Sequence, residues 1–159
     1  MSDVGDFMEP NAPSPDESLA LLPSVLAGVV VAALLSPKDA YFIGNFAFYW
    51  VPQAIVFAVL LFFVSRPAVL SGVAVVLALY LALYGTWVFS RPHPESMAWL
   101  GYLFSLPGAG LGAIVGALYV KRQSYKRAAI AGAVAALFTF AGLAVNQLVV
   151  CSTVMYCGS

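Results

Sequence analysis

Charged side chains are scarce in this 159-residue chain, where they make up 9% of the residues while 62% are hydrophobic. A soluble domain carries about 25% charged residues, because its surface must be hydrated. The few charges are also confined, since five of the seven acidic residues precede position 18 and four of the seven basic residues lie within 121–127. Such a chain cannot cover a water-facing surface, so we expect its surroundings to be the hydrocarbon of a lipid bilayer.

Several classes of function are disfavoured by what is missing. A net charge of zero argues against a nucleic-acid partner. The long apolar runs contain no Asp, Glu, Lys, Arg or His, which disfavours proton relays and coupling-ion sites. Catalytic, metal-binding and cofactor-binding signatures are also missing, so we predict a protein that is not an enzyme and needs no cofactor. The acidic segment 1–18 lacks the basic start of a cleaved secretory signal, and we interpret it as a retained, flexible cytoplasmic tail.

Five apolar segments meet or approach the length of about 20 residues that a helix needs to cross a bilayer. They must be helical, because unpaired backbone groups are too costly in lipid. The sequence therefore predicts an all-α integral membrane protein, a compact bundle of five transmembrane helices. The alternative is four, if the short first segment with Pro23 only lies on the membrane surface. The predicted spans are 19–35, 46–64, 68–89, 98–120 and 128–150, and a short extracytoplasmic tail, 151–159, follows them.

The basic residues predict the orientation of these spans. The loop at 121–127 holds four of them and is expected in the cytoplasm. Counting spans outward from this loop places Arg66 inside as well, and Lys38 and Arg91 outside. The prediction is thus a multi-pass protein of the plasma (inner) membrane, with a cytoplasmic N-terminus and an extracytoplasmic C-terminus. All three tryptophans fall at predicted outer ends of spans, which agrees with this orientation: Trp50, Trp87 and Trp99.

Small residues recur at every fourth position in several of the spans. Gly108, Gly112 and Gly116 form such a row in the fourth span, and Gly132 lies between Ala128 and Ala136 in the fifth. Rows of this kind let another helix approach backbone to backbone. Packing among the five helices is the first interpretation of the row, and a seam for a dimer or a hetero-complex is the alternative.

The predicted outer face holds the remaining candidates for a contact site. Trp50 belongs to an aromatic group that is typical of a membrane interface. Arg91, His93 and Glu95 share a proline-rich loop for which solvation is the simplest interpretation, and Asn146 near the end of the last span is expected to bond another helix. The alternative is a polar contact site that a partner reaches from outside.

Cys151 and Cys157 lie close together near the C-terminus, with a spacing that fits neither zinc nor thioredoxin-like chemistry. We predict a disulfide bond between them, because the outer face is oxidising. Two unrelated thiols are the alternative.

Small size, uncharged spans and small-residue rows favour a non-enzymatic protein that acts through protein–protein contacts in the membrane. An accessory subunit of a membrane complex and an immunity protein against a membrane-targeting toxin both fit this description. The alternative is a small channel or carrier for a neutral or weakly polar solute. The expected partners are the lipid bilayer and either another membrane protein or a second copy of the chain.

Overall fold

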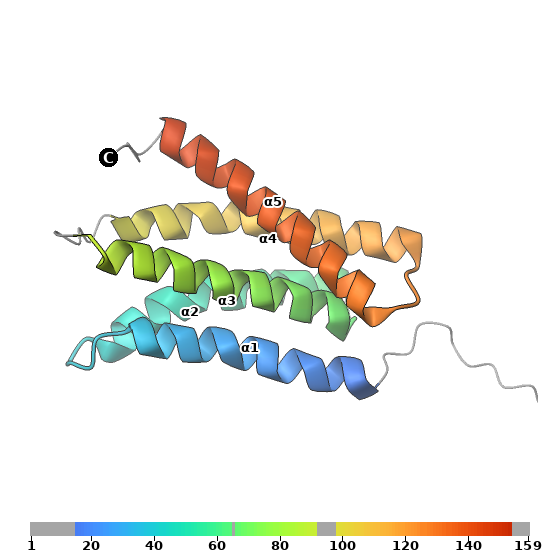
Figure 1. The fold of residues 1–159 in the computed structure, drawn as a ribbon, viewed down its shortest axis with the longest axis horizontal. Helices are drawn as coiled ribbons and strands as arrows, with labels where there is room; N and C mark the ends of the chain where they lie inside the picture. Colours follow the sequence, from blue (N-terminus) through green and yellow to red (C-terminus); the bar gives the residue numbers. More distant parts are fainter. Residues whose placement is uncertain (1–14, 65, 92–97, 154–159) are drawn as a thin grey trace, which may run out of the picture.

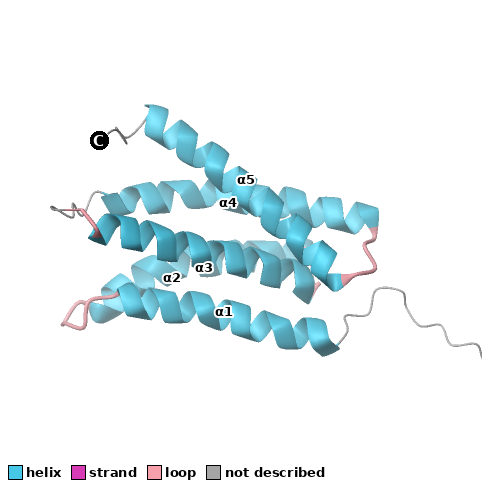
Figure 2. Cartoon of the chain, viewed as in Figure 1, coloured by secondary structure: helices cyan, strands magenta, loops and turns pink. Residues whose placement is uncertain are grey.

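The computed structural model describes residues 15–64, 66–91 and 98–153, and these residues form five helices and no strand (Figure 2). The helices run side by side along the long axis of the molecule, and each reverses the direction of the one before it (Figure 1). The predicted all-α bundle of five helices is confirmed. The helices are α1 (Pro15–Leu35), α2 (Phe42–Phe63), α3 (Pro67–Phe89), α4 (Ala98–Gln123) and α5 (Ala128–Thr153).

Proline and backbone conformation explain several helix ends. α1 and α3 each begin with a proline, whose fixed φ suits the first helical position and whose missing N–H is not needed there. α2 ends at Phe63, and Val64 after it is extended. The turn between α4 and α5 is short because Ser124 adopts a left-handed conformation, with φ at 48°.

All five helices are longer than the spans predicted for them, α3 by the single residue Pro67. α1 and α2 each start four residues before the predicted spans at 19–35 and 46–64, and α4 and α5 each extend three residues past the predicted ends at 120 and 150. The prediction stopped where polar residues begin, whereas a helix can continue into the lipid headgroup region. Lys121 and Arg122 lie in the last turn of α4, where basic side chains interact favourably with the helix dipole.

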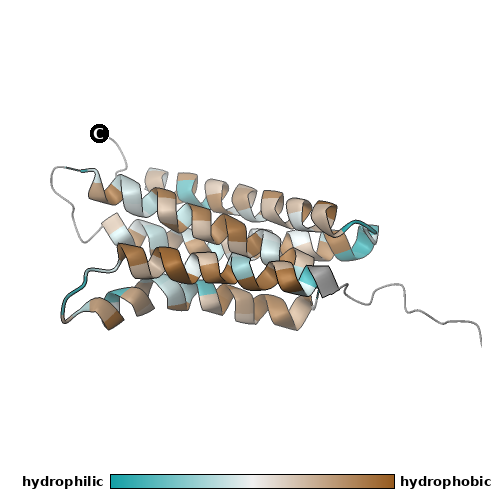
Figure 3. Cartoon of the chain, turned by 60° about the horizontal axis from the view of Figure 1, so that its bottom comes forward, coloured by the Kyte–Doolittle hydropathy of each residue, from teal (hydrophilic) through white to brown (hydrophobic). Residues whose placement is uncertain are grey.

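All five helices are long and apolar enough to cross a membrane, and α1, the shortest of these segments, still offers the 19 residues Glu17–Leu35. Large apolar side chains point outward from the bundle: Phe62 is 87% exposed and Leu34 is 74% exposed. Apolar colouring dominates along the helices, and hydrophilic colouring gathers at their ends (Figure 3). A surface of this kind is stable in lipid and not in water, and it indicates a multi-pass membrane protein with five rather than four candidate spans among the described residues.

α3 is the central helix and packs against each of the other four. Its inward face carries Val73, Leu77 and Leu81, none of which is exposed. α1 packs along α3, and α5 crosses α4 at an oblique angle (Figure 1). α1 and α5 both pack against α3. The lateral face between α1 and α5 is therefore bounded by these two helices, and α3 lies beneath it.

Candidate functional site

The glycine row of α4 faces α5 inside the same chain. A Cβ atom at Gly112 would collide with the backbone oxygen of Phe138 and lie 3.1 Å from Gly142 Cα. A Cβ atom at Gly116 would lie 2.8 Å from Phe138 Cβ, and one at Gly108 would lie 2.5 Å from the Gly142 oxygen. This row therefore serves the packing of α4 on α5.

Gly132 packs against α3 rather than α4. A Cβ atom at Gly132 would lie 2.8 Å from the backbone oxygen of Ala68, and a Cβ atom at Gly72 would collide with the backbone oxygen of Gly132. Sequence reasoning missed Gly72 and Gly142 as members of these contacts. The pair Ala68 and Gly72 has the same four-residue spacing as the row in α4, so it could have been found from the sequence.

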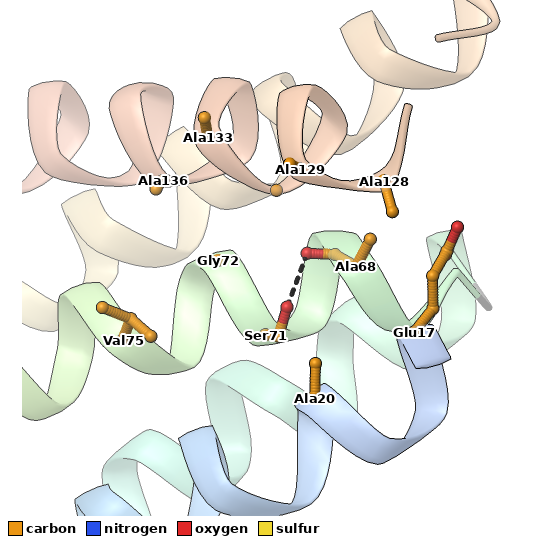
Figure 4. Close-up of a pocket in the computed structure, with 11 residues that line it drawn as sticks. Glu17, Ala20, Ala68, Ser71, Gly72, Val75, Ala128, Ala129, Ala133 and Ala136 are labelled. Carbon is orange, nitrogen blue, oxygen red and sulfur yellow. Dashed lines mark hydrogen bonds between the residues drawn. The ribbon is translucent and has the colours of Figure 1, made fainter. Parts of the chain in front are cut away.

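A lateral groove of about 550 Å³ opens between α1 and α5, with α3 as its floor (Figure 4). Glu17 lies at one end of this groove (Figure 4). The remaining lining is apolar or small, and Ser71 donates its hydroxyl to the Ala68 backbone oxygen at 2.9 Å, so its polarity is satisfied within α3. We call this the α1–α3–α5 groove; the residues that line it are Glu17, Ala20, Ala68, Ser71, Gly72, Val75, Ala128, Ala129, Gly132, Ala133 and Ala136.

One arginine joins three parts of the chain beside this groove. Arg66 donates from Nε and Nη2 to the two carboxylate oxygens of Glu17, at 3.2 and 3.1 Å, and from Nη1 to the backbone oxygen of Tyr125 at 2.6 Å. Desolvation raises the pKa of the Tyr125 phenol. The start of α1, the α2–α3 connection and the α4–α5 loop therefore meet at one end of the bundle.

A buried polar network links α2, α3, α4 and α5. It lies in the middle of the bundle and in the half that is farther from Arg66. Gln53 donates from Nε2 to the Tyr102 hydroxyl at 2.8 Å, and Tyr102 donates to the backbone oxygen of Tyr49 at 2.9 Å. Ser105 donates to the Tyr80 hydroxyl at 2.7 Å, and Tyr80 bonds Gln147 Oε1 at 3.3 Å. These bonds satisfy polar groups that would otherwise be costly in the membrane.

Gln53, Ser105 and Gln147 can be recognised in the sequence as polar residues within apolar runs, whereas the tyrosines are harder to assign, because an aromatic residue in a span also fits an interface anchor. Spacing offered a signal: Tyr49 and Gln53 lie four residues apart, and Tyr102 and Ser105 lie three apart, so each pair shares a helix face. Within this network, Gln53 is 1% exposed and its Oε1 atom has no hydrogen-bond partner among the described residues.

The predicted outer-face residues do not converge on one site. Trp50 is partly buried and packs against Phe57 and beside Gly28, whereas Arg91 lies over the ring of Trp87, 3.9 Å from its centroid. Asn146 faces α4 and donates from Nδ2 to the Phe104 backbone oxygen at 2.5 Å. His93 and Glu95 lie outside the described residues.

Cys151 lies in the last turns of α5, where Gln147 Nε2 is 3.5 Å from its Sγ atom. Cys157 lies outside the described residues, so the disulfide bond between the two cysteines stays a prediction.

In the part of the chain that the structure describes, no group of three or more His, Cys, Asp or Glu side chains is placed to hold a metal ion. The α1–α3–α5 groove is a recess of the described residues that has a charged group, Glu17, at one end. Comparison with protein-family models, with curated proteins and with solved structures gave no match. The geometry of the chain is thus the basis for a functional proposal.

Proposed function

We propose that this protein acts non-enzymatically, as the partner of another membrane protein. That other protein inserts one of its transmembrane helices into the α1–α3–α5 groove. An accessory subunit of a membrane complex and an immunity protein that masks a membrane-targeting toxin would both work in this way. The single observation that carries the proposal is the groove itself, which measures about 550 Å³ and lies open on the side of the bundle.

The lining of the groove suits a helix better than it suits a flexible solute. Ala129 and Ala133 are exposed on α5, and Ala20 is exposed on α1, so their methyl groups form low walls. Gly72 of α3 and Gly132 of α5 have no side chains to fill the space between these walls. Without water to drive association in lipid, close backbone packing on small residues supplies much of the attraction between helices. By contrast, the exposed face of α2 carries bulky side chains such as Phe62, which is suited to lipid contact.

We further propose that the protein resides in the plasma (inner) membrane with the Arg66 end of the bundle in the cytoplasm. The support is the distribution of basic residues, because Arg66, the last turn of α4 and the α4–α5 loop carry five of the seven and lie at one end. Lys38 and Arg91 then lie outside, as does the C-terminus. The groove belongs to the cytoplasmic half of the membrane in this orientation, since it is lined by the first turns of α1, α3 and α5.

Site-specific photo-crosslinking in native membranes tests the helix partner. A benzophenone side chain at Ala133 lies in the groove, and the same side chain at Ala58, an exposed alanine of α2, serves as the matched control. We expect a discrete protein adduct from position 133 and none from position 58. The adduct should disappear when Ala129→Leu fills the groove in the same chain.

Three results would contradict the proposal. Adducts to lipid alone at both positions would show that the groove contains no protein. An adduct whose mass is twice that of the chain would assign the groove to a second copy. A protein adduct that survives Ala129→Leu would place the partner elsewhere on α5.

A further inference from the structure

The last turn of α4 and the α4–α5 loop present four exposed basic side chains at one end of the bundle; we call Lys121, Arg122, Lys126 and Arg127 the basic loop. Only four residues separate the two helices. Ser124 holds a left-handed turn and its N–H bonds the Val120 oxygen at 3.1 Å. The bond from Arg66 to the Tyr125 oxygen ties the same loop to α3. The four charges are therefore held on a short, hydrogen-bonded turn between two helices rather than on a long flexible linker.

Helix stability explains the positions of only two of these four charges. Lys121 and Arg122 lie at the C-terminus of α4, where a helix dipole favours cations. Lys126 and Arg127 directly precede α5, whose N-terminal end is already positive, and the first turn of α5 contains no acidic residue. The cost of placing two cations there falls when an anion binds between them and the free N–H groups of the first turn.

Glu17 is the nearest described carboxylate in this region, and its charge is matched by Arg66, which contacts both of its oxygens. Among the described side chains at this end, Arg66 is paired with Glu17, and the four side chains of the basic loop are exposed. The apolar stretches of α4 and α5 end beside the loop, so the loop lies at the depth of the lipid headgroups.

From this geometry we propose that the basic loop binds the phosphate headgroup of an anionic phospholipid. The acyl chains of such a lipid lie along the apolar outer faces of α4 and α5, while the headgroup lies between the Lys126 and Arg127 side chains and the start of α5. Long basic side chains suit this position, because their methylene groups remain in the apolar layer while their charges reach the headgroups. The inference is independent of the helix partner proposed for the groove.

Native mass spectrometry of the full chain in detergent micelles, titrated with phosphatidylglycerol or with phosphatidylcholine, tests the assignment. Lys126→Gln with Arg127→Gln removes two charges from the basic loop, and Lys38→Gln with Arg91→Gln removes two from the opposite end. We expect the loop variant to bind phosphatidylglycerol about 25-fold more weakly, at about a fivefold loss for each basic residue. The control variant should bind it as wild type does, and phosphatidylcholine binding should change in neither.

A second variant, Lys121→Gln with Arg122→Gln, keeps the test independent of any local effect on the start of α5. It should also weaken phosphatidylglycerol binding, with thermal unfolding in phosphatidylcholine-containing micelles unchanged. Equal losses in the loop and control variants would reveal a general effect of net charge and overturn the assignment. Unchanged phosphatidylglycerol binding in both loop variants would also overturn it, and would leave an acidic protein segment as the counterpart of the loop.

Discussion

Arg66 contacts both carboxylate oxygens of Glu17, although the two residues are separated by 49 positions in the sequence. The pair is more buried than a typical surface ion pair, since the Glu17 side chain is 8% exposed. Because Arg66 also holds the backbone of Tyr125, this one side chain fixes the relative position of α1, α3 and the α4–α5 loop. The pair thus stabilises the end of the bundle at which both the groove and the basic loop lie.

Replacing Glu17 with Gln should lower the free energy of unfolding by about 1–3 kcal/mol, because it leaves a partly buried guanidinium without its counter-charge. Thermal unfolding in detergent micelles measures the change. Asp39→Asn is the matched control: it removes an exposed acidic charge at the other end and retains the oxygen that accepts the Tyr41 N–H. Equal stability of the Glu17 and Asp39 variants would show that the ion pair contributes nothing.

Gly112→Leu should destabilise the bundle by about 3 kcal/mol, the upper part of the usual range for an overpacked site. Even a Cβ atom at this position meets the backbone of α5, so the two helices must separate. Gly44→Leu is the control, since a Cβ atom at Gly44 has no neighbour within 4 Å. Both variants should insert into the membrane, because leucine is compatible with lipid, and only the Gly112 variant should unfold at lower temperature. Wild-type stability of Gly112→Leu would contradict the close packing of α4 on α5.

The Gln53–Tyr102 hydrogen bond should appear as a coupling energy in a double-mutant cycle. Tyr102→Phe removes the acceptor of Gln53 Nε2 and the donor to the Tyr49 oxygen, and it should cost about 1–3 kcal/mol. Gln53→Leu in the same chain removes the group left without a partner, so the double variant should be more stable than the sum of single losses predicts, by about 0.6–1.7 kcal/mol. Strict additivity would count against the bond. Tyr41→Phe, at an exposed tyrosine, controls for loss of a hydroxyl.

The helical fold could be predicted from sequence because a bilayer imposes one length and one kind of hydrogen bonding on each span. Apolar runs bounded by Ser65-Arg66-Pro67 or by the basic loop leave few alternatives. The helix ends were less predictable, as at α2, which starts at Phe42 in a stretch of mixed polarity. The hydropathy of a sequence shows where the hydrocarbon layer begins and ends. A helix instead ends where its backbone turns, which need not be at that boundary.

The groove and the polar network were not predictable from the sequence, because both depend on which helices are neighbours. A row of small residues predicts close packing but does not name the partner helix: Gly112 lies against α5, whereas Gly132 lies against α3. In the same way, Gln53 and Tyr102 are polar groups on separate spans, and only the packing of α2 on α4 brings them within 2.8 Å.

A disulfide bond between Cys151 and Cys157 is expected if the C-terminus faces an oxidising compartment. It should add about 2–3 kcal/mol at most by chain-entropy reasoning, because the loop that it closes is short. Mass spectrometry of protein alkylated without reductant, taken from membranes of such a compartment, measures it. Two alkylated thiols would refute the bond and weaken the outside assignment of the C-terminus. The double variant Cys151→Ser with Cys157→Ser should retain the fold, since the bond fastens only the end of α5.

The proposed membrane orientation underlies both proposals: with the Arg66 end in the cytoplasm, the groove and the basic loop lie on the cytoplasmic side. Topology reporters fused after Ser65, after Gln123 and after Ser159 measure it most directly. Five spans with the Arg66 end inside predict a cytoplasmic signal from the first two fusions and an extracytoplasmic signal from the third. A cytoplasmic signal from the fusion after Ser159 would contradict the account.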